Sequence, residues 1–250
     1  MKILLSPAKR LNEKLSDYSG KCTVPNFLED SELLIKKLKK LSKNEISSLM
    51  KLSPNLAELN FNRYQIWEKE NIKQGKVAIF LFEGDAYKGL DIQSFSTNEL
   101  QLLNQKLFIL SGLYGVLKPL DCLLPYRLEM GTKFKNSRGK DLYAFWRTKL
   151  TEYIKKETKN EALINLASKE YASVIDFKQL EKPIVQVDFL QEKNNEYKNI
   201  AIYSKRARGL MTAFIAKNDI EKVDDLKAFD EENYFFNNNL SKENHLVFTR

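Results

Sequence analysis

The chain has 250 residues, of which 43% are hydrophobic and 11% aromatic, enough apolar side chains to bury a sizeable core. Its 41 Lys+Arg against 33 Asp+Glu give a formal charge of +8, which favours a polyanionic partner or an acidic ligand, although a lysine-rich solvated surface gives the same count. With a single histidine, His245, and two cysteines, the chain cannot build the usual zinc sites or a di-iron helix bundle, and a Ser-His-Asp triad is disfavoured.

The first strand is expected over residues 2–5, and later strands over 77–82, 107–110, 162–166, 184–189, 200–203 and 246–248, because these runs are apolar, β-branched or aromatic. Between the first two, a helix is expected over residues 32–40, and further helices begin at a capping box on Ser42 and at Ser53 before Pro54. A second capping box at Ser96 opens a helix through residue 103, and residues 140–146 read as another helix start. No linker or repeat divides the chain. We therefore expect one compact domain over residues 1–250 with a mixed α/β (α+β) fold, as a monomer.

Cys22 and Cys122 belong to no Cys-x-x-Cys pair, so we expect unpaired thiols that pack in the interior, with redox sensing as the alternative. No apolar run approaches the roughly 20 residues that cross a bilayer, and the apolar stretch at the start is too short for a signal peptide. We expect a cytoplasmic protein without membrane association.

Polar, cationic or glycine-containing loops follow five of the expected strands, at residues 6–10, 83–89, 111–121, 167–171 and 204–209. Ligands of open α/β sheets bind outside the carboxyl ends of the strands. If the strands are largely parallel, these loops converge on one edge of the sheet. That edge would be basic, lined by glycine and rich in tyrosine.

Each loop also has a simpler interpretation. Residues 6–9 could form only a turn with a solvated lysine, and residues 111–115 could be a tight turn, since they match neither a Walker loop nor a Rossmann fingerprint. Arg127 suits bidentate phosphate contact, but an ion pair with Glu129 is the alternative. The aromatic side chains of residues 140–146 either pack in the core or form a base-stacking platform. Three cations within residues 205–208 favour phosphate contact.

An ordered series of short motifs runs along nearly the whole chain. It consists of Ser-Pro-Ala-Lys at 6–9, Gly-Asp-x-Tyr at 84–87, Ser-Gly-Leu-Tyr-Gly-Val-Leu at 111–117, Lys-Pro-Leu-Asp at 118–121, Pro-Tyr-Arg-Leu-Glu-Met-Gly at 125–131, Gly-Lys-Asp-Leu-Tyr at 139–143, Asn-Leu-Ala-Ser at 165–168, Ala-Arg-Gly-Leu-Met at 207–211 and Tyr-Phe-Phe at 234–236. This series resembles the YaaA family of bacterial peroxide-stress proteins.

The resemblance implies a fold of the family's own, with a central sheet flanked by helices, a basic cleft and a helix-hairpin-helix-like element. That element is expected at residues 42–60, which lack the usual glycine hairpin. The resemblance also implies a role in the response to hydrogen peroxide: binding of duplex or branched DNA without strong sequence preference, low free iron and limited iron-dependent damage. Arg10 stands where the family usually has threonine, which adds a cation.

We expect DNA or phosphate contacts from seven cations, five of which match cationic positions of the family motifs: Lys9, Lys118, Arg127, Lys205 and Arg208, joined by Arg10 and Arg206. The expected stacking residues, which could instead hold the cations in place, are Tyr87, Tyr114 and Tyr126.

Asp85, Asp121 and Glu129 would orient the cations or be traces of catalysis. A binder without catalytic activity is favoured, and no metal or cofactor is expected. The alternative is an enzyme acting on a nucleotide or another small acidic or phosphorylated substrate, with Lys9, Asp85 and Glu129 as catalytic candidates. An iron-binding protein is the weakest interpretation, because nitrogen and sulfur ligands are missing.

Overall fold

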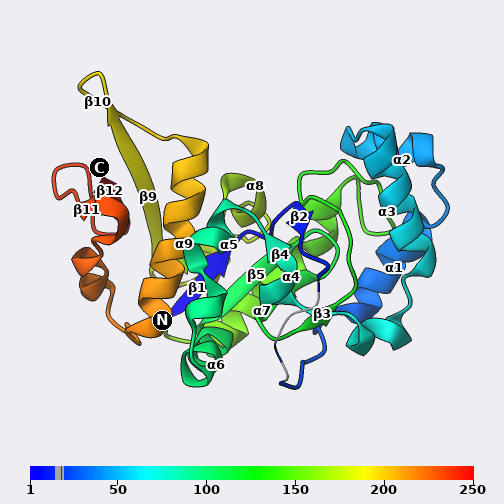
Figure 1. Ribbon diagram of the computed structural model, residues 1–250, viewed down its shortest axis with the longest axis horizontal. Helices are drawn as coiled ribbons and strands as arrows, with labels where there is room; N and C mark the ends of the chain where they lie inside the picture. The colour runs from blue at the N-terminus through cyan, green and yellow to red at the C-terminus, as the bar shows by residue number, and fades with distance from the viewer. Residues whose placement is uncertain (15–17, 19) are drawn as a thin grey trace.

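A central, mostly parallel eight-stranded sheet flanked by helices organises the protein, in a computed structural model that describes residues 1–14, 18 and 20–250 (Figure 1). The strand order is β11-β12-β9-β8-β1-β5-β6, and β10 pairs with β9. The strands of this sheet are β1 (Lys2–Leu5), β5 (Leu107–Ser111), β6 (Gly115–Leu117), β8 (Leu163–Asn165), β9 (Ile184–Lys193), β10 (Glu196–Lys198), β11 (Phe235–Phe236) and β12 (His245–Thr249).

The centre of the sheet is β1, which pairs in parallel with β5 on one side and β8 on the other. Ile3 aligns with Leu107 of β5 and with Ile164 of β8, and all three side chains are fully buried. Continuous apolar runs are typical of parallel strands that are covered on both faces. The sequence-based strands at 2–5, 107–110, 162–166, 184–189 and 246–248 are confirmed.

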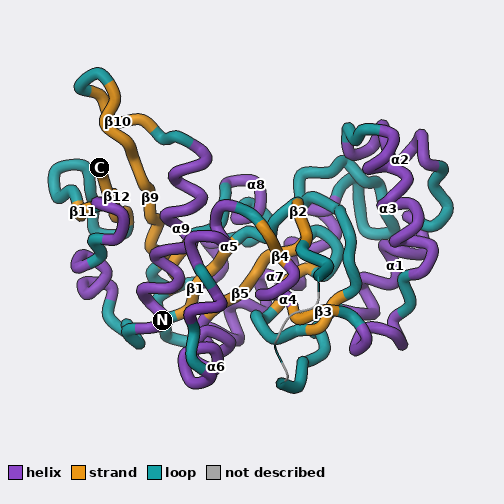
Figure 2. Tube along the Cα trace, in the orientation of Figure 1, coloured by secondary structure: helices purple, strands orange, loops and turns teal. Residues whose placement is uncertain are grey.

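Helices cover the sheet and extend to one side of it. They are α1 (Leu28–Leu38), α2 (Lys43–Met50), α3 (Pro54–Ile66), α4 (Ala78–Leu81), α5 (Asp85–Leu90), α6 (Thr97–Lys106), α7 (Leu142–Thr158), α8 (Lys169–Ala172) and α9 (Ala201–Lys217). Short 3-10 helices cover Lys69–Gln74, Ile92–Ser94, Phe177–Leu180, Val223–Ala228 and Glu231–Asn233. Helices α1–α3 gather at one end of the molecule, and β9–β12 lie at the other (Figures 1 and 2). None of the described helices is long and apolar enough to cross a membrane.

Side-chain caps fix the starts of these helices where the sequence predicts them. The capping boxes on Ser42 and Ser96 are both complete, and Ser53 caps α3. Asp141 caps α7 by accepting the Ala144 N–H at 2.8 Å. These caps satisfy amide groups that a helix leaves without an internal partner.

Two predicted strands are wrong. Residues 77–82 form the end of β3 (Lys76–Val77), the helix α4 and the start of β4 (Phe82–Glu83). Buried apolar residues surround this segment, and a short apolar run has no periodicity that separates a buried helix turn from a strand. Residues 200–203 open the long helix α9, with Ile202 and Tyr203 exposed. The β-branched and aromatic residues there are overridden by the helix formers that follow them.

The expectation of unpaired cysteines is also wrong, because Cys22 and Cys122 form a disulfide across a sequence separation of 100. Strand β7 (Cys122–Leu123) pairs with β3, and the neighbouring Thr23 forms backbone hydrogen bonds with Leu120 and Cys122. The two cysteines are far apart in sequence, so spacing gave no signal that the fold brings them together.

Candidate functional site

The loops that leave the carboxyl ends of β1 and β8 meet at the centre of the sheet. The Ser168 N–H donates to Ser6 Oγ at 2.8 Å, and the two hydroxyl oxygens are 3.2 Å apart. After β1 the next strand of the sheet is β5 on one side, whereas after β8 it is β9 on the other. Such a switch of direction opens a crevice where α/β proteins bind ligands.

A cavity of about 290 Å³ occupies this crevice. Its walls come from the loop after β1, from β4 and the start of α5, from the segment around α8, and from α9. The predicted convergence of polar loops is therefore confirmed for these segments. The loop at residues 111–115 instead lies in the core: the Tyr114 N–H donates to Ser111 Oγ, and Gly115 adopts a φ of 71° against Trp146. It is a buried tight turn.

A backbone contact between α5 and α9 sets the geometry of one wall. A methyl group built on Gly209 would lie 1.8 Å from the Ala86 carbonyl oxygen, and one on Gly89 would lie 2.2 Å from the Arg206 carbonyl oxygen. Only glycine permits this approach of the two helices. The contact brings Asp85, at the start of α5, into the same cavity wall as Lys205 and Arg208 of α9.

Two cations at the cavity mouth are held by carboxylates. Lys9 Nζ lies 3.0 Å from Glu129 Oε2, and Arg10 Nε lies 3.0 Å from Glu83 Oε2. Arg127 Nη2 lies 2.9 Å from the other oxygen of Glu129, so this carboxylate joins Lys9 and Arg127. The ion pairs expected of Glu129 with neighbouring cations are present, and Arg127 forms the ion pair that was the alternative to phosphate contact. Both Lys9 and Arg10 stay exposed, with 60% and 77% of their side chains accessible.

Arg208 differs from the other cations. Its Nε is buried and has no hydrogen-bond partner among the described residues. Burial lowers the pKa of the Arg208 guanidinium, and the negative charge of Asp188 opposes this shift. Asp188 itself binds the imidazole of His245 at 2.8 Å. Arg208 also borders a second cavity of about 320 Å³, whose wall includes Asp188.

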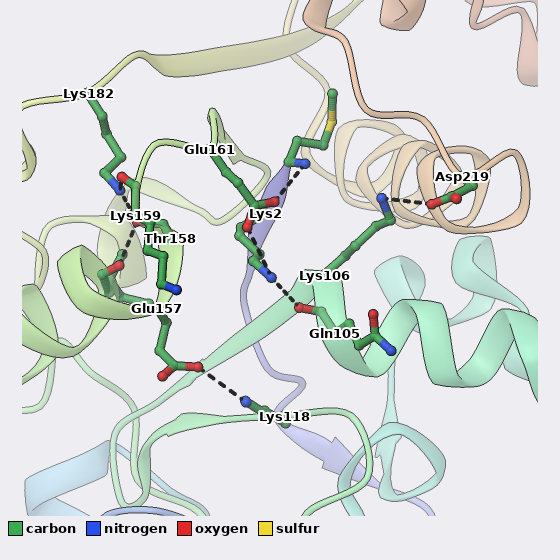
Figure 3. Close-up of polar contacts among 12 residues, drawn as sticks. Lys2, Gln105, Lys106, Lys118, Glu157, Thr158, Lys159, Glu161, Lys182 and Asp219 are labelled. Carbon is green, nitrogen blue, oxygen red and sulfur yellow. Dashed lines mark hydrogen bonds and ion pairs between the residues drawn. The ribbon is translucent and has the colours of Figure 1, made fainter.

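Lys118 and Arg206 lie away from the cavity, which corrects the expectation that all the cations gather at one edge. Strand β6 runs antiparallel to β5, so Lys118 emerges at the opposite end of the sheet and pairs with Glu157 at 3.3 Å (Figure 3). Consecutive residues of a helix point in different directions, so Arg206 does not line the cavity as its neighbour Lys205 does. Arg206 pairs with Glu232 instead. The break in chain direction at β6 is not visible in the sequence.

The three tyrosines are not available as a stacking platform. Tyr114 is fully buried and accepts a hydrogen bond from Trp67 Nε1 at 2.8 Å, and the buried Tyr126 hydroxyl lies 2.6 Å from Ser111 Oγ. Tyr87 is 8% exposed and donates to the Ser6 carbonyl, which steadies the loop after β1. Burial raises the pKa of each of these phenols. The stacking prediction is wrong, because all three tyrosines are buried.

The aromatic side chains Phe145 and Trp146 near the start of α7 are also buried and cannot stack on bases. Trp146 is fully buried and donates from Nε1 to the Gly112 carbonyl at 2.9 Å. Phe145 packs edge-on against it, at 2% exposure. Of the two interpretations of residues 140–146, core packing is therefore the right one.

The remaining carboxylates have different environments, and Asp121 lies with Lys118 away from the cavity. Asp121 is buried and accepts hydrogen bonds from the Lys118 N–H and the Thr23 hydroxyl, and burial raises its pKa. Glu170 accepts the Gly131 N–H at 2.9 Å. Asp85 lines the cavity and forms no hydrogen bond or ion pair with the described residues. Within the described part of the chain, no group of three or more His, Cys, Asp or Glu side chains could hold a metal ion.

An open basic groove lies elsewhere on the molecule, beside α2. It has a volume of about 570 Å³, and its walls include Lys37 of α1, Lys133 and Lys135. Glu45 also lines it, but its carboxylate is engaged by the N–H and hydroxyl of Ser42 in the capping box, which lower its pKa. The sequence signal for this groove is residues 131–140, which contain four cations and no acid. The residues predicted from the sequence do not include Lys37, Lys133 or Lys135.

Helices α2 and α3 follow each other in the segment at residues 42–60, where the helix-hairpin-helix-like element is expected, and together they form a helical hairpin. The connection is Lys51-Leu52-Ser53. Lys51 adopts a left-handed conformation with φ of 53°, the position that glycine usually fills at the end of a helix. The missing glycine is thus replaced by a lysine in the same conformation.

The fold and these two surfaces define a mixed α/β protein with a small cavity at the strand ends and a separate groove with three lysines beside α2. A sequence profile described as "Peroxide stress protein YaaA" matches residues 1–240. The chain belongs to the YaaA peroxide stress protein family.

Similar proteins of this family come from several bacteria. A UPF0246 protein of Flavobacterium johnsoniae is 44% identical over 252 residues, covering 100% of both chains. UPF0246 proteins of Saccharophagus degradans and Legionella pneumophila (strain Lens) are each 45% identical, covering 100% of this chain and 99% of their own.

Proposed function

We propose that this protein acts in the response to hydrogen peroxide by binding duplex or branched DNA without strong sequence preference, and that it thereby helps to limit iron-dependent oxidative damage. Membership of a peroxide stress family supports a role in the response to hydrogen peroxide. The observation that carries DNA binding is the groove beside α2, where three lysines face an open surface and the one acid is engaged in a helix cap.

The groove suits contact with a phosphate backbone. Lys133 and Lys135 are exposed and have no ion-pair partner among the described residues, so their charge is available to a ligand. Lys37 donates to the Lys135 carbonyl at 2.5 Å and lies over the Phe134 ring at 5.5 Å, which orders the loop that carries both neighbouring lysines. Lysines act as point charges toward phosphate, and such contacts give affinity without sequence information.

The helical hairpin extends this surface. Lys51 in the turn is exposed, and α3 starts directly after it, so its first amides and a lysine lie next to each other. Helix starts favour phosphate because their amides and dipole attract negative charge. Of the cations proposed from the sequence, the exposed Lys9, Arg10 and Lys205 are kept as secondary phosphate contacts at the cavity mouth.

The test is the double variant Lys133→Ala, Lys135→Ala, measured for binding to a random-sequence duplex. Two lost phosphate contacts reduce the dependence of log affinity on log salt by roughly 1.8, because each contact contributes about 0.9. The matched control is Lys156→Ala, Lys193→Ala, which removes the same charge from exposed lysines outside the groove. Equal losses in both variants would mean that net charge alone attracts DNA, and the groove proposal would fail.

The same variants test the cellular role. In cells that lack their own copy of the gene, the groove variant should restore less survival under hydrogen peroxide than the control variant. Full protection by a groove variant that no longer binds DNA would separate the peroxide response from DNA binding and refute the proposal.

A further inference from the structure

The partly buried side chain of Arg208 lacks a hydrogen-bond acceptor for its Nε among the described residues. A guanidinium that loses water on burial is normally compensated by a carboxylate or by carbonyl oxygens. The buried Nε of Arg208 has no such partner among the described residues, and the nearby Asp188 is engaged by His245. The side chain borders the cavity at the strand ends, so a ligand in that cavity can supply the missing acceptor.

The surroundings of Arg208 add a second cation and a free acceptor. Lys205 lies one helical turn earlier on α9, lines the same cavity and has no ion-pair partner among the described residues. Asp85 faces the cavity from α5, which the Gly89–Gly209 contact holds against α9. Two cations with an unengaged carboxylate fit a molecule that carries both an anionic group and a hydroxyl or amine donor.

The remaining walls set the size and shape of the molecule. Leu5, Ala8 and Leu166 supply aliphatic surface, and the largely buried Tyr87 and Tyr171 also line the cavity. A volume of about 290 Å³ is at the lower end of small-molecule pockets, which span roughly 300–1,000 Å³. The ion pairs of Lys9 and Arg10 flank the opening. A duplex therefore does not fit inside, and a volume of this size suits a small molecule.

We propose that this cavity is a binding site for a small phosphate monoester of mononucleotide size, with Lys205 and Arg208 on the phosphate and Asp85 on a hydroxyl or amino group of the same molecule. The site is distinct from the basic groove beside α2 and shares no lining residue with it.

The test uses inorganic phosphate, adenosine monophosphate and adenosine with the full chain, by thermal unfolding at constant ionic strength and by calorimetric titration. Phosphate and the monophosphate should raise the unfolding temperature, and adenosine should bind at least tenfold more weakly than its monophosphate. Arg208→Gln should weaken the monophosphate at least tenfold, because a bidentate charged contact is lost. Lys205→Gln should weaken it several-fold. This exposed position keeps the test valid should the Arg208 variant fold poorly.

The matched control is Arg206→Gln, the same charge change two residues away on α9, at a side chain outside the cavity. Its affinity for the monophosphate should stay within twofold of the wild-type value. The double variant of the groove, Lys133→Ala, Lys135→Ala, should also stay within twofold. Failure of both phosphate and the monophosphate to bind would overturn the proposal. So would equal effects of Arg206→Gln and Arg208→Gln, because the binding would then be diffuse attraction to α9.

Discussion

Replacing Arg208 by methionine should stabilise the protein in the absence of ligand. The substitution keeps an unbranched apolar stem in α9 and removes a guanidinium whose Nε is buried without a partner among the described residues. An unsatisfied buried donor costs about 1–3 kcal/mol, more for a charged group. Arg208 keeps some contact with water, so the lower part of this range applies, and the free energy of unfolding should rise by about 1 kcal/mol.

Urea unfolding of the wild-type and Arg208→Met proteins measures this difference. The slope of free energy against urea should stay unchanged, since the substitution alters neither the fold nor the surface exposed on unfolding. Arg206→Met is the comparison: it breaks the ion pair with Glu232 at the surface and should lower stability by about 0.5 kcal/mol. A loss of stability larger than 1 kcal/mol in Arg208→Met would show that the side chain holds the fold together, and the interpretation of Arg208 as a ligand-binding group would fail.

Three further predictions follow from the backbone and the disulfide. Gly209→Ala should cost about 3 kcal/mol in urea unfolding, because its methyl would lie 1.8 Å from the Ala86 carbonyl oxygen; Gly84→Ala, whose methyl would lie 3.4 Å from Ala8 Cβ, should cost much less, and equal costs would contradict the close contact. Reduction of Cys22–Cys122 should lower the free energy of unfolding by about 2–4 kcal/mol, since the bond closes a loop with a sequence separation of 100, and a Cys22→Ser variant should not respond to reductant. Lys51→Gly should raise the free energy of unfolding by about 0.5 kcal/mol by relieving a φ of 53°, and a decrease would refute the left-handed turn.

The central part of the fold could be predicted from the sequence because its signals are local. Apolar runs predicted the strands β1, β5 and β8, and the capping boxes on Ser42 and Ser96 predicted the starts of α2 and α6. The convergence of strand-end loops also followed, because parallel strands place their carboxyl ends at one edge. The start of α9 did not follow, since Ile200, Ile202 and Tyr203 favour a strand locally, and the helix formers that follow them, together with the packing of α9 against α5, override this preference.

The candidate site could be predicted only in part, because side-chain direction depends on tertiary structure. Arg206 and Arg208 are equivalent in the sequence, yet one pairs with Glu232 and the other borders the cavity. Lys118 was misplaced because the chain reverses at β6. The groove lysines Lys133 and Lys135 lie outside the motif strings, and composition over residues 131–140 was their one visible signal.

The salt dependence of DNA binding tests the central claim most directly. The affinity of the wild-type protein for a random-sequence duplex would be measured by fluorescence anisotropy between about 50 and 200 mM salt, the range over which phosphate contacts weaken steeply. If Lys37, Lys133 and Lys135 each neutralise one phosphate, log affinity should fall against log salt with a slope of about −2.7, at about 0.9 per contact, and the secondary contacts at the cavity mouth would make the slope steeper. A slope near zero, or no binding at the lowest salt concentration, would contradict the claim that this protein binds DNA through a lysine-lined groove.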